Sequence, residues 1–384
     1  MALVTKTADL EAFCARVAGE SFLAIDTEFM RDRTYWPKLC LWQIAGAEEA
    51  VAIDPLAPGI DLRPALGLMA DPRTVKVFHA ARQDLEIFWR LMDGRLPTPI
   101  FDTQIAAMVC GFGEDVAYET LVTKVAKGQL DKSSRFTDWS KRPLSEAQLR
   151  YALADVTYLR VIYERLLERI AKAGRLDWVE AEQAALADPG LFEQDPEEAW
   201  KRLKLRSRDP RFIATVQRLA AWRERSARTR DLPRSRVLRD DLLLELAAHR
   251  PTSVEALREH ERVNLDRESS RQVVAIIQEA MALPPAELPR PEPVPETPRG
   301  VGPLVDLLRV LLKICAEDAG VAQRLVATSA DLEAIAQDDD AAVPALQGWR
   351  RELFGAKALA LKHGRVALGV KGRKAAVIPL GDGT

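Results

Sequence analysis

The sequence predicts an α/β domain with a mixed sheet and covering helices, followed by all-α domains. Short apolar runs typical of buried strands are confined to the first part of the chain, at residues 22–25, 40–45, 50–53, 75–78 and 99–101. Helical patterns begin only after the third run and then alternate with strands, as expected for a mixed sheet covered by helices. Beyond residue 190 the strand patterns nearly vanish and amphipathic helical patterns replace them.

The individual helices follow from apolar residues at helical spacing between polar or proline-containing turns. In the first domain they cover residues 64–69, 85–92, 103–109, 119–126 and 145–171. In the second part they cover residues 212–227, 240–248, 253–259 and 269–283. Asp102 stands directly before one of these helices, so we predict that it is a structural N-cap.

Four acidic residues and one tyrosine carry the chemistry of the first domain. Asp26 and Glu28 follow the first apolar run, and residues i and i+2 of a strand project from the same face. Tyr151 and Asp155 are four residues apart in a helical pattern, which places both side chains on one helix face. Asp84 belongs to the helix after the fourth apolar run.

Carboxylates that are brought together without basic partners repel each other, and an unpaired buried carboxylate is costly. A divalent cation removes both costs. Hard oxygen ligands suit Mg²⁺ or Mn²⁺. We therefore predict that Asp26, Glu28, Asp84 and Asp155 are ligands of divalent metal.

The order and spacing of these five residues resemble the DEDDy branch of the 3′–5′ exonucleases. The surrounding segments sharpen the resemblance to the ribonuclease D family, over residues 22–159. These segments are FLAIDTEFMRDRTYWPKLCLWQIA, VFHAARQDLEIF, FDTQIAAMVCG and LDKSSRFTDWSKRPLSEAQLRYALADVTYL. The resemblance implies a ribonuclease H-like fold and a 3′–5′ exoribonuclease that releases nucleoside 5′-monophosphates. The implied substrate is structured RNA with a single-stranded 3′ end, such as precursor tRNA.

The resemblance also implies a role for each residue in a two-metal mechanism. Asp26 would bridge two ions, Mg²⁺ or Mn²⁺. Glu28 and Asp155 would complete the ion on the nucleophile side, and Asp84 would hold the second ion, partly through water. Tyr151 would orient the attacking water, because a phenol with a pKa near ~10 is a poor base at neutral pH.

The domain boundaries follow from shifts in composition. Residues 1–188 are the predicted exonuclease domain, and residues 200–283 resemble an HRDC domain. Residues 284–303 contain eight prolines and are predicted to form an extended linker. Residues 304–370 are predicted to be a second, divergent HRDC-like helical domain. The tail from residue 371 is expected to be poorly ordered.

Five further residues are candidates for contact with substrate, each with an ordinary alternative. Phe29 could stack on the terminal base or pack in the core. His79 could approach a phosphate or be a buried, hydrogen-bonded histidine. Lys132, Arg135 and Trp139 lie in a basic and aromatic loop, which could contact substrate or remain solvated.

The net charge of −2 hides a local excess of basic residues, because residues 201–240 hold 14 Lys and Arg against four Asp and Glu. This excess favours contact with nucleic acid over an ordinary charged helix surface. The chain shows no amino-terminal signal pattern and no apolar run long enough to span a membrane. Its four cysteines are far apart, which argues against a zinc site or disulfide framework and favours the cytoplasm.

Two other functions stay open at this point. A 3′–5′ DNA exonuclease would use the same five residues, since none of them is placed to recognise a 2′-hydroxyl. A catalytically idle nucleic-acid-binding adaptor is disfavoured, because such a protein would be expected to lose one or more of the four carboxylates.

Overall fold

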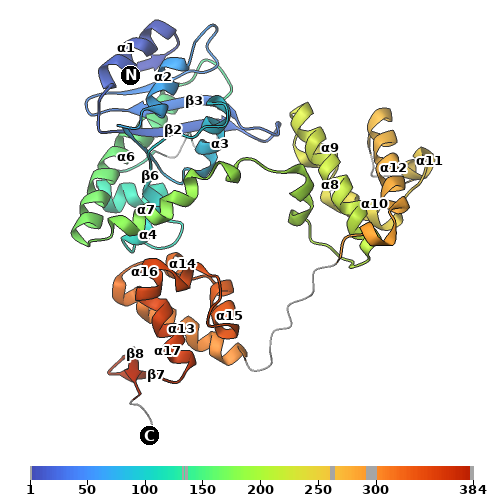
Figure 1. The fold of residues 1–384 in the computed structure, drawn as a ribbon. Coiled ribbons are helices and arrows are strands. Elements are labelled where there is room, and N and C mark those ends of the chain that lie inside the picture. The colour runs from blue at the N-terminus through green and yellow to red at the C-terminus, as the bar shows by residue number, and fades with distance from the viewer. Residues whose placement is uncertain (1, 132–133, 135–136, 260–263, 291–300, 381–384) are drawn as a thin grey trace.

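The computed structural model describes residues 2–131, 134, 137–259, 264–290 and 301–380. Figure 1 shows an amino-terminal domain built around a sheet, a helical domain in yellow and orange, and a carboxyl-terminal, mostly helical domain in orange and red. We call them the sheet domain, the middle domain and the carboxyl-terminal domain. The predicted fold class, a mixed α/β sheet domain followed by helical domains, is confirmed.

The sheet has six strands in the order β1-β4-β3-β2-β5-β6. They are β1 (Ala2–Val4), β2 (Phe22–Met30), β3 (Lys38–Ala45), β4 (Ala50–Ile53), β5 (Val75–Phe78) and β6 (Ile100–Asp102). Strand β3 runs antiparallel to β2 and β4, and the other neighbours are parallel. Five strands lie where the sequence predicts them. The pattern missed β1, which is only three residues long.

Helices cover both faces of this sheet. They are α1 (Thr7–Val17), α2 (Arg63–Ala70), α3 (Arg82–Leu91), α4 (Thr103–Val109), α5 (Tyr118–Leu121), the π-helix η1 (Val122–Ala126), α6 (Glu146–Lys172), α7 (Leu176–Ala184) and the 3₁₀ turns Ala185–Ala187 and Pro189–Leu191. The helix predicted at residues 119–126 is thus α5 continued by a π-helical turn. The sequence pattern missed α1.

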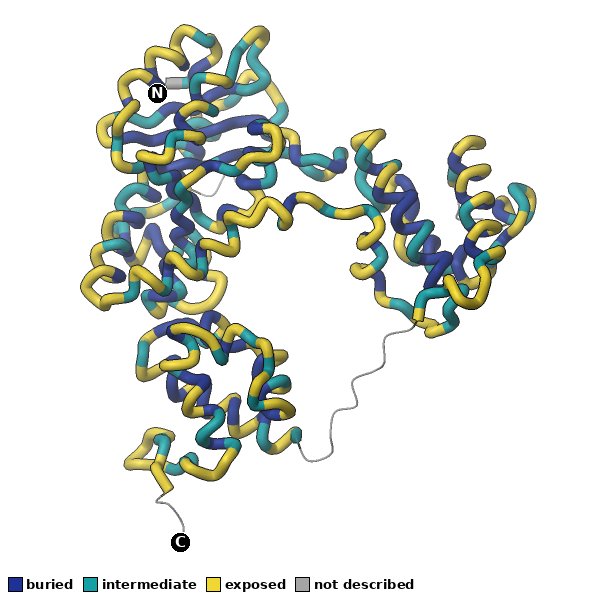
Figure 2. The backbone as a smooth tube through the Cα atoms, in the orientation of Figure 1, coloured by how far each residue is buried: buried dark blue, intermediate teal, exposed yellow. Residues whose placement is uncertain are grey.

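The two faces of the sheet belong to two hydrophobic cores, because side chains alternate along each strand. In β2, Leu23 and Ile25 pack with α1, α2 and α3, whereas Ala24 packs on the side of α4 and α6. Figure 2 shows the strands of the sheet as largely buried tube. Strand β2 lies between β3 and β5. Its first three residues pair with β5, and its residues from Ala24 onward, with Asp26 and Glu28, pair with β3.

The middle domain is helical throughout its described part. It contains the 3₁₀ helix η4 (Pro196–Arg202), α8 (Pro210–Arg230), α9 (Arg234–Val237), α10 (Asp240–His249), α11 (Val254–Arg258), α12 (Arg267–Ala282) and the 3₁₀ turn η5 (Pro285–Glu287). Helix α8 forms the centre of its core. The predicted linker at residues 284–303 includes residues 291–300, which lie outside the described residues.

The carboxyl-terminal domain is helical up to Lys362 and then ends in a hairpin. Its elements are α13 (Val301–Ala319), α14 (Gln323–Val326), α15 (Ser329–Gln337), η6 (Pro344–Leu346), α16 (Gly348–Arg350), the π-helix η7 (Arg351–Gly355), α17 (Ala356–Lys362), β7 (Val366–Lys371) and β8 (Lys374–Pro379). The strands β7 and β8 pair antiparallel, so the expectation of a poorly ordered tail is wrong up to residue 380. Gly372 has a positive φ of 66° in the connecting turn. A glycine at such a position favours a tight hairpin turn, so the sequence does contain a signal for this hairpin.

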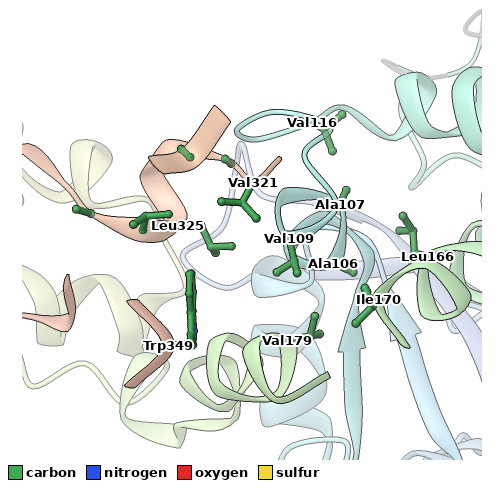
Figure 3. Packing of buried hydrophobic residues seen from close by; sticks show 14 of the residues in the cluster. Ala106, Ala107, Val109, Val116, Leu166, Ile170, Val179, Val321, Leu325 and Trp349 are labelled. Carbon is green, nitrogen blue, oxygen red and sulfur yellow. The ribbon is translucent and has the colours of Figure 1, made fainter. Parts of the chain in front are cut away.

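The carboxyl-terminal domain packs against the sheet domain. Figure 3 shows Val321, Leu325 and Trp349 beside Val109 and Val179 of the sheet domain. The indole rings of Trp178 and Trp349 stack at 4.2 Å with an interplanar angle of 12°. Across the same contact the amide of Ala322 donates to the carbonyl of Met108 at 3.0 Å. Within the described residues, no helix is both long enough and apolar enough to cross a membrane.

Candidate active site

Strand β2 positions the first two carboxylates. Asp26 stands opposite Gln43 of β3, and Glu28 stands opposite Leu41. The two side chains share a strand face, as the i, i+2 spacing predicts. The regular ladder is interrupted directly after Glu28, where the register shifts between Glu28 and Phe29.

Helix α6 brings the third carboxylate to the same place. Ser145 caps this helix and forms a capping box with Gln148, so the start of the helix is fixed six residues before Tyr151. Asp155, one further turn along, is 7% exposed. One carboxylate oxygen from each of Asp26, Glu28 and Asp155 lies within 4.8 Å of the others.

Asp84 lies beside this trio, in the first turn of α3. The hydroxyl of Thr27 donates a hydrogen bond to the carboxylate of Asp84. Thr27 is the residue between the two β2 carboxylates, so α3 and the end of β2 are joined at the site. The charge of Asp84 is close enough to raise the pKa of both Asp26 and Glu28.

The pKa values show that these carboxylates are poorly stabilised as anions. Burial, and then the charges of Asp155 and Asp84, raise the pKa of Glu28 to about 9. The same causes raise the pKa of Asp26 well above its usual value. Burial raises the pKa of Asp84 to about 7, against the hydrogen bond from Thr27. Clustered acidic groups with raised pKa values are typical of functional sites.

The donor set fits a divalent cation. The trio supplies only carboxylate oxygens, which are the hard ligands that such ions prefer. No described Lys or Arg forms an ion pair with Asp26 or Glu28, so a cation would supply the missing positive charge.

A cavity of about 330 Å³ lies over the trio. It is lined by Asp26, Thr27, Glu28, His79, Ala117, Tyr118, Glu119, Leu130, Tyr151, Asp155 and Leu159. The cavity thus contains four of the five predicted catalytic residues, and Asp84 is held behind Thr27. Tyr151 belongs to the cavity wall, as its spacing from Asp155 predicts.

No sequence pattern pointed to Tyr118 as a residue of the site. Its hydroxyl donates to the backbone carbonyl of Asp155, 37 residues away, and burial raises its pKa well above 10. A lone tyrosine at the start of a short helix matches no motif, and only the tertiary contact with α6 reveals it. Glu119 of the same helix also reaches the cavity without a sequence signal.

Comparison with known proteins settles the family. Residues 1–171 match a family described as 3′-5′ exonuclease, and residues 213–265 match the HRDC domain family. Ribonuclease D of Gluconacetobacter diazotrophicus is 50% identical over 380 residues, covering 98% of this chain and 96% of that protein. Ribonuclease D of Acidiphilium cryptum is 49% identical over 384 residues, covering 98% and 97%. The chain belongs to the ribonuclease D family. It is a 3′–5′ exoribonuclease, a hydrolase of phosphodiester bonds.

A solved structure supports the same assignment. The crystal structure of Escherichia coli RNase D, described as an exoribonuclease involved in structured RNA processing, is 30% identical to this chain with a TM-score of 0.80. The match covers 94% of this chain and 98% of that one. The predicted family, fold class and exoribonuclease activity of this ribonuclease D family member are therefore confirmed.

The predicted substrate contacts of this ribonuclease D family member stay predictions, but the structure shows the surroundings of three of the five residues. His79 lines the cavity, but both ring nitrogens are engaged, with Thr103 Oγ1 at 3.0 Å and the Val116 carbonyl at 3.1 Å. Since a carbonyl only accepts, the Nε2–H of the ring donates to the Val116 carbonyl. Nδ1 lies against the Thr103 hydroxyl, which itself donates to the Phe78 carbonyl at 3.0 Å. His79 therefore has the geometry of the hydrogen-bonded buried histidine that was the alternative interpretation.

The other four candidates lie away from the cavity or outside the described residues. Trp139 is 2% exposed and its ring lies 6.1 Å from that of Tyr151, so it packs behind the tyrosine, and its contact with substrate stays a prediction. Phe29 is partly exposed on β2 and is not among the residues that line the cavity. Lys132 and Arg135 fall outside the described residues, and their contact stays a prediction.

Proposed function

We propose that this 3′–5′ exoribonuclease works with two divalent ions, Mg²⁺ or Mn²⁺, held by Asp26, Glu28, Asp84 and Asp155. The observation that carries the proposal is the trio of carboxylates within 4.8 Å under one cavity, with Asp84 beside it. When bound, such ions lower the pKa of water and stabilise the charge that develops on the phosphate.

We assign a separate task to each carboxylate. The charges of Asp155, Asp84 and Glu28 all act on Asp26, which suits a ligand shared by both ions. Glu28 and Asp155 complete the side where water is activated. Asp84 holds the second position, and the hydrogen bond from Thr27 fixes its carboxylate there.

We assign the orientation of the attacking water to the hydroxyl of Tyr151. Of the two tyrosines in the cavity, Tyr118 has its proton committed to the carbonyl of Asp155. Tyr151 stands one helical turn from Asp155, so its oxygen can accept a hydrogen bond from a water on the Glu28 side. Trp139 packs behind the ring of Tyr151 and limits its movement.

The proposed substrate is RNA with a single-stranded 3′ end, with precursor tRNA as the natural example. Hydrolysis releases a nucleoside 5′-monophosphate and leaves the 3′ oxygen on the penultimate nucleotide. The names of the full-length relatives and the HRDC match support RNA as the substrate class. The four isolated cysteines, which are all free thiols, support the cytoplasm as the place of action.

A single assay tests this proposal. Matched RNA and DNA oligomers with single-stranded 3′ tails are incubated with Mg²⁺, with Mn²⁺, and then with excess EDTA. We expect stepwise release of 5′-monophosphates from RNA in either metal and none in EDTA. Faster digestion of DNA would favour the DNA exonuclease instead, and hydrolysis that survives EDTA would contradict the metal assignment.

A further inference from the structure

We propose a second site for RNA, in which a basic depression between η1 and α6 holds phosphates of the strand upstream of the 3′ end. The inference rests on the proposed function, since it concerns the same RNA that enters the catalytic cavity. The depression has a volume of about 340 Å³. It is lined by Lys124, Val125, Lys127, Arg165, Glu168, Arg169 and Lys172.

The depression is charged and its charge is not neutralised. Five of its seven lining residues are basic and one is acidic. Lys124, Lys127 and Lys172 are exposed, and none of the three forms an ion pair with a carboxylate in the described part of the chain. A concave surface of one charge attracts the opposite charge, and RNA phosphates carry it along the whole strand.

The local basic excess of residues 201–240 behaves differently. Many of its arginines already have carboxylate partners in the structure. These pairs are Arg218–Glu279, Arg223–Asp240, Arg225–Glu197, Arg228–Glu224, Arg230–Asp266, Arg234–Glu224 and Arg239–Asp241. These seven pairs engage half of the 14 basic residues, whereas the three lysines of the depression have no such partner among the described residues.

The depression is held in a fixed shape by contacts between its two walls. The guanidinium of Arg165 on α6 donates to the carbonyl of Val125 in η1. Lys127 ends the π-helix in the left-handed conformation, with its amide bonded to the Val122 carbonyl. The next residue, Gly128, lies directly against the ring of Tyr158 on α6, where a Cβ atom would clash. The backbone at Lys127, at the edge of the depression, is therefore held in place by its contacts with Val122 and by the packing of Gly128.

The position of the depression suits a strand whose 3′ end lies in the cavity. Arg165 and Lys172 follow Asp155 by ten and seventeen residues on α6, which is roughly 15 and 25 Å along the helix axis. A stacked strand advances about 3.4 Å per nucleotide, so the depression is roughly four to seven nucleotides from the scissile bond. Helix α5, which lines the cavity with Tyr118, leads directly into η1.

The test compares two triple variants with equal changes in net charge. The first replaces Lys124, Lys127 and Lys172 by Gln. Arg165 and Arg169 stay, because Arg165 bonds to Val125 and Arg169 lies over the Phe112 ring. The control replaces Lys6, Lys357 and Lys374 by Gln, since these lysines are exposed before α1, on α17 and on β8.

Two measurements are made on the wild type and both variants. Binding of a single-stranded RNA of about 16 nucleotides is followed by fluorescence anisotropy in EDTA over a range of salt concentrations. Hydrolysis of an RNA of about three nucleotides, which is too short to reach the depression, is followed in Mg²⁺.

We expect the first variant to bind the long RNA on the order of tenfold more weakly, with a salt slope lower by about 2, because about 0.7 is lost per phosphate contact. Its hydrolysis of the short RNA should equal that of the wild type. An unchanged salt slope, or an equal loss in the control variant, would overturn the site. Wild-type protein that does not hydrolyse the short RNA in Mg²⁺ would refute the proposed function instead, so the two failures are distinguishable.

Discussion

Two glutamates in this chain, the half-buried Glu28 and the buried Glu224, have opposite electrostatic surroundings. Burial and two neighbouring carboxylates raise the pKa of Glu28 to about 9. Burial by itself would raise the pKa of Glu224 as well, but hydrogen bonds from Arg234 and Tyr35 outweigh it and lower the pKa to about 2. The glutamate anion is thus destabilised at Glu28 in the sheet domain and stabilised at Glu224 in the middle domain.

Glu224 and its hydrogen-bond partners, which we call the Glu224 centre, join the middle domain to the loop between β2 and β3. Glu224 is 1% exposed and accepts hydrogen bonds from Arg234 and from the hydroxyl of Tyr35. Tyr35 belongs to the loop between β2 and β3, and its amide donates to Asp231 at 3.1 Å. The amide of Trp36 donates to the same oxygen at 3.0 Å. A paired buried charge therefore joins domains, whereas the clustered carboxylates around Glu28 provide a site for a cation.

The largest expected effect comes from removing a carboxylate at the catalytic centre. Asp26→Asn should lower kcat on the order of 10⁴-fold, because several kcal/mol of metal-dependent stabilisation are lost. The melting temperature of the metal-free protein should not fall, since the substitution removes a buried group that three carboxylates repel. Single-turnover hydrolysis of labelled RNA and thermal unfolding in EDTA measure the two quantities. A folded Asp26→Asn protein with near-normal turnover would remove the two-metal assignment.

Neutralising the carboxylate of the Glu224 centre should lower the free energy of unfolding and leave turnover unchanged. Glu224→Gln leaves Arg228 and Arg234 beside a neutral amide, and breaking a buried ion pair costs about 3–5 kcal/mol. Hydrolysis of a short single strand should stay unchanged below the melting temperature. The matched control is Glu197→Gln, whose ion pair with Arg225 is exposed and contributes about 0–1 kcal/mol. Equal melting temperatures for the two variants would show that the Glu224 centre does not stabilise the fold.

The two centres should respond to pH with opposite signs. The folded pKa of Glu224 is depressed, so its contribution is present above about 4.5 and is lost as the pH falls toward about 2. The loss is about 3 kcal/mol on the linkage scale. The folded pKa of Glu28 is raised, so the metal-free protein should lose stability as the pH rises from about 4.5 to about 9.

Thermal unfolding in EDTA across this pH range separates the two contributions. Glu224→Gln should flatten the acidic side of the stability profile, and Glu28→Gln should flatten the alkaline side. Added Mg²⁺ should restore stability mainly above neutral pH, because a bound cation stabilises the ionised carboxylates. If Glu28→Gln left the alkaline side unchanged, the raised pKa would not describe this site.

Tyr151→Phe tests the catalytic centre without touching a carboxylate. The ring and its packing on Trp139 are kept and one oxygen is removed. If that oxygen orients water, kcat should fall roughly 10²-fold with little change in KM. Glu28→Gln should instead be partly rescued by excess Mn²⁺, so a metal titration of both variants distinguishes the two roles. Wild-type kcat in Tyr151→Phe would leave the tyrosine a structural role on α6.

Local sequence patterns were sufficient to predict most of the strands and helices of the sheet domain. Alternation and apolar runs predicted the strands around Asp26, and i, i+4 spacing predicted that Tyr151 and Asp155 share one helix face. The spacing of Asp84 did not reveal its contact with Thr27, because that contact depends on how α3 packs against β2. Tyr118 escaped for the same reason, since its partner is 37 residues away.

Contacts between residues far apart in the chain were the main feature that could not be predicted from the sequence. The basic excess at residues 201–240 favoured nucleic-acid contact, but Arg228 and Arg234 are engaged with Glu224 and Tyr35. The docking of Trp349 on Trp178 likewise joins residues with no local relation. Such contacts depend on tertiary packing, whereas helix and strand periods are local properties.

The smallest expected effect concerns Asp102, the predicted N-cap of α4, which the structure confirms in that role. Its carboxylate accepts from the amide of Gln104 at 2.7 Å. It also accepts from the amides of Ala80 and Ala81, at 3.0 and 2.8 Å, directly before α3. As a cap alone, Asp102→Asn would be almost neutral, because Asn caps helices as well as Asp. In this protein the second carboxylate oxygen, Oδ2, also accepts a hydrogen bond, from the backbone amide of Ala81. In Asp102→Asn the side-chain NH₂ would take the place of this oxygen, so two donors would face each other.

Asp102→Asn should therefore cost about 1–2 kcal/mol of stability, since one buried donor loses its acceptor. The matched control is Asp195→Asn, because Asp195 is exposed and caps η4 by accepting from the amide of Glu197. Chemical denaturation of both variants measures the difference. Because α3 carries Asp84, kcat of Asp102→Asn should fall slightly, and far less than that of Asp26→Asn. A loss as large as that of Asp26→Asn would make Asp102 a catalytic residue, and equal stability of the two cap variants would show that its second oxygen contributes nothing.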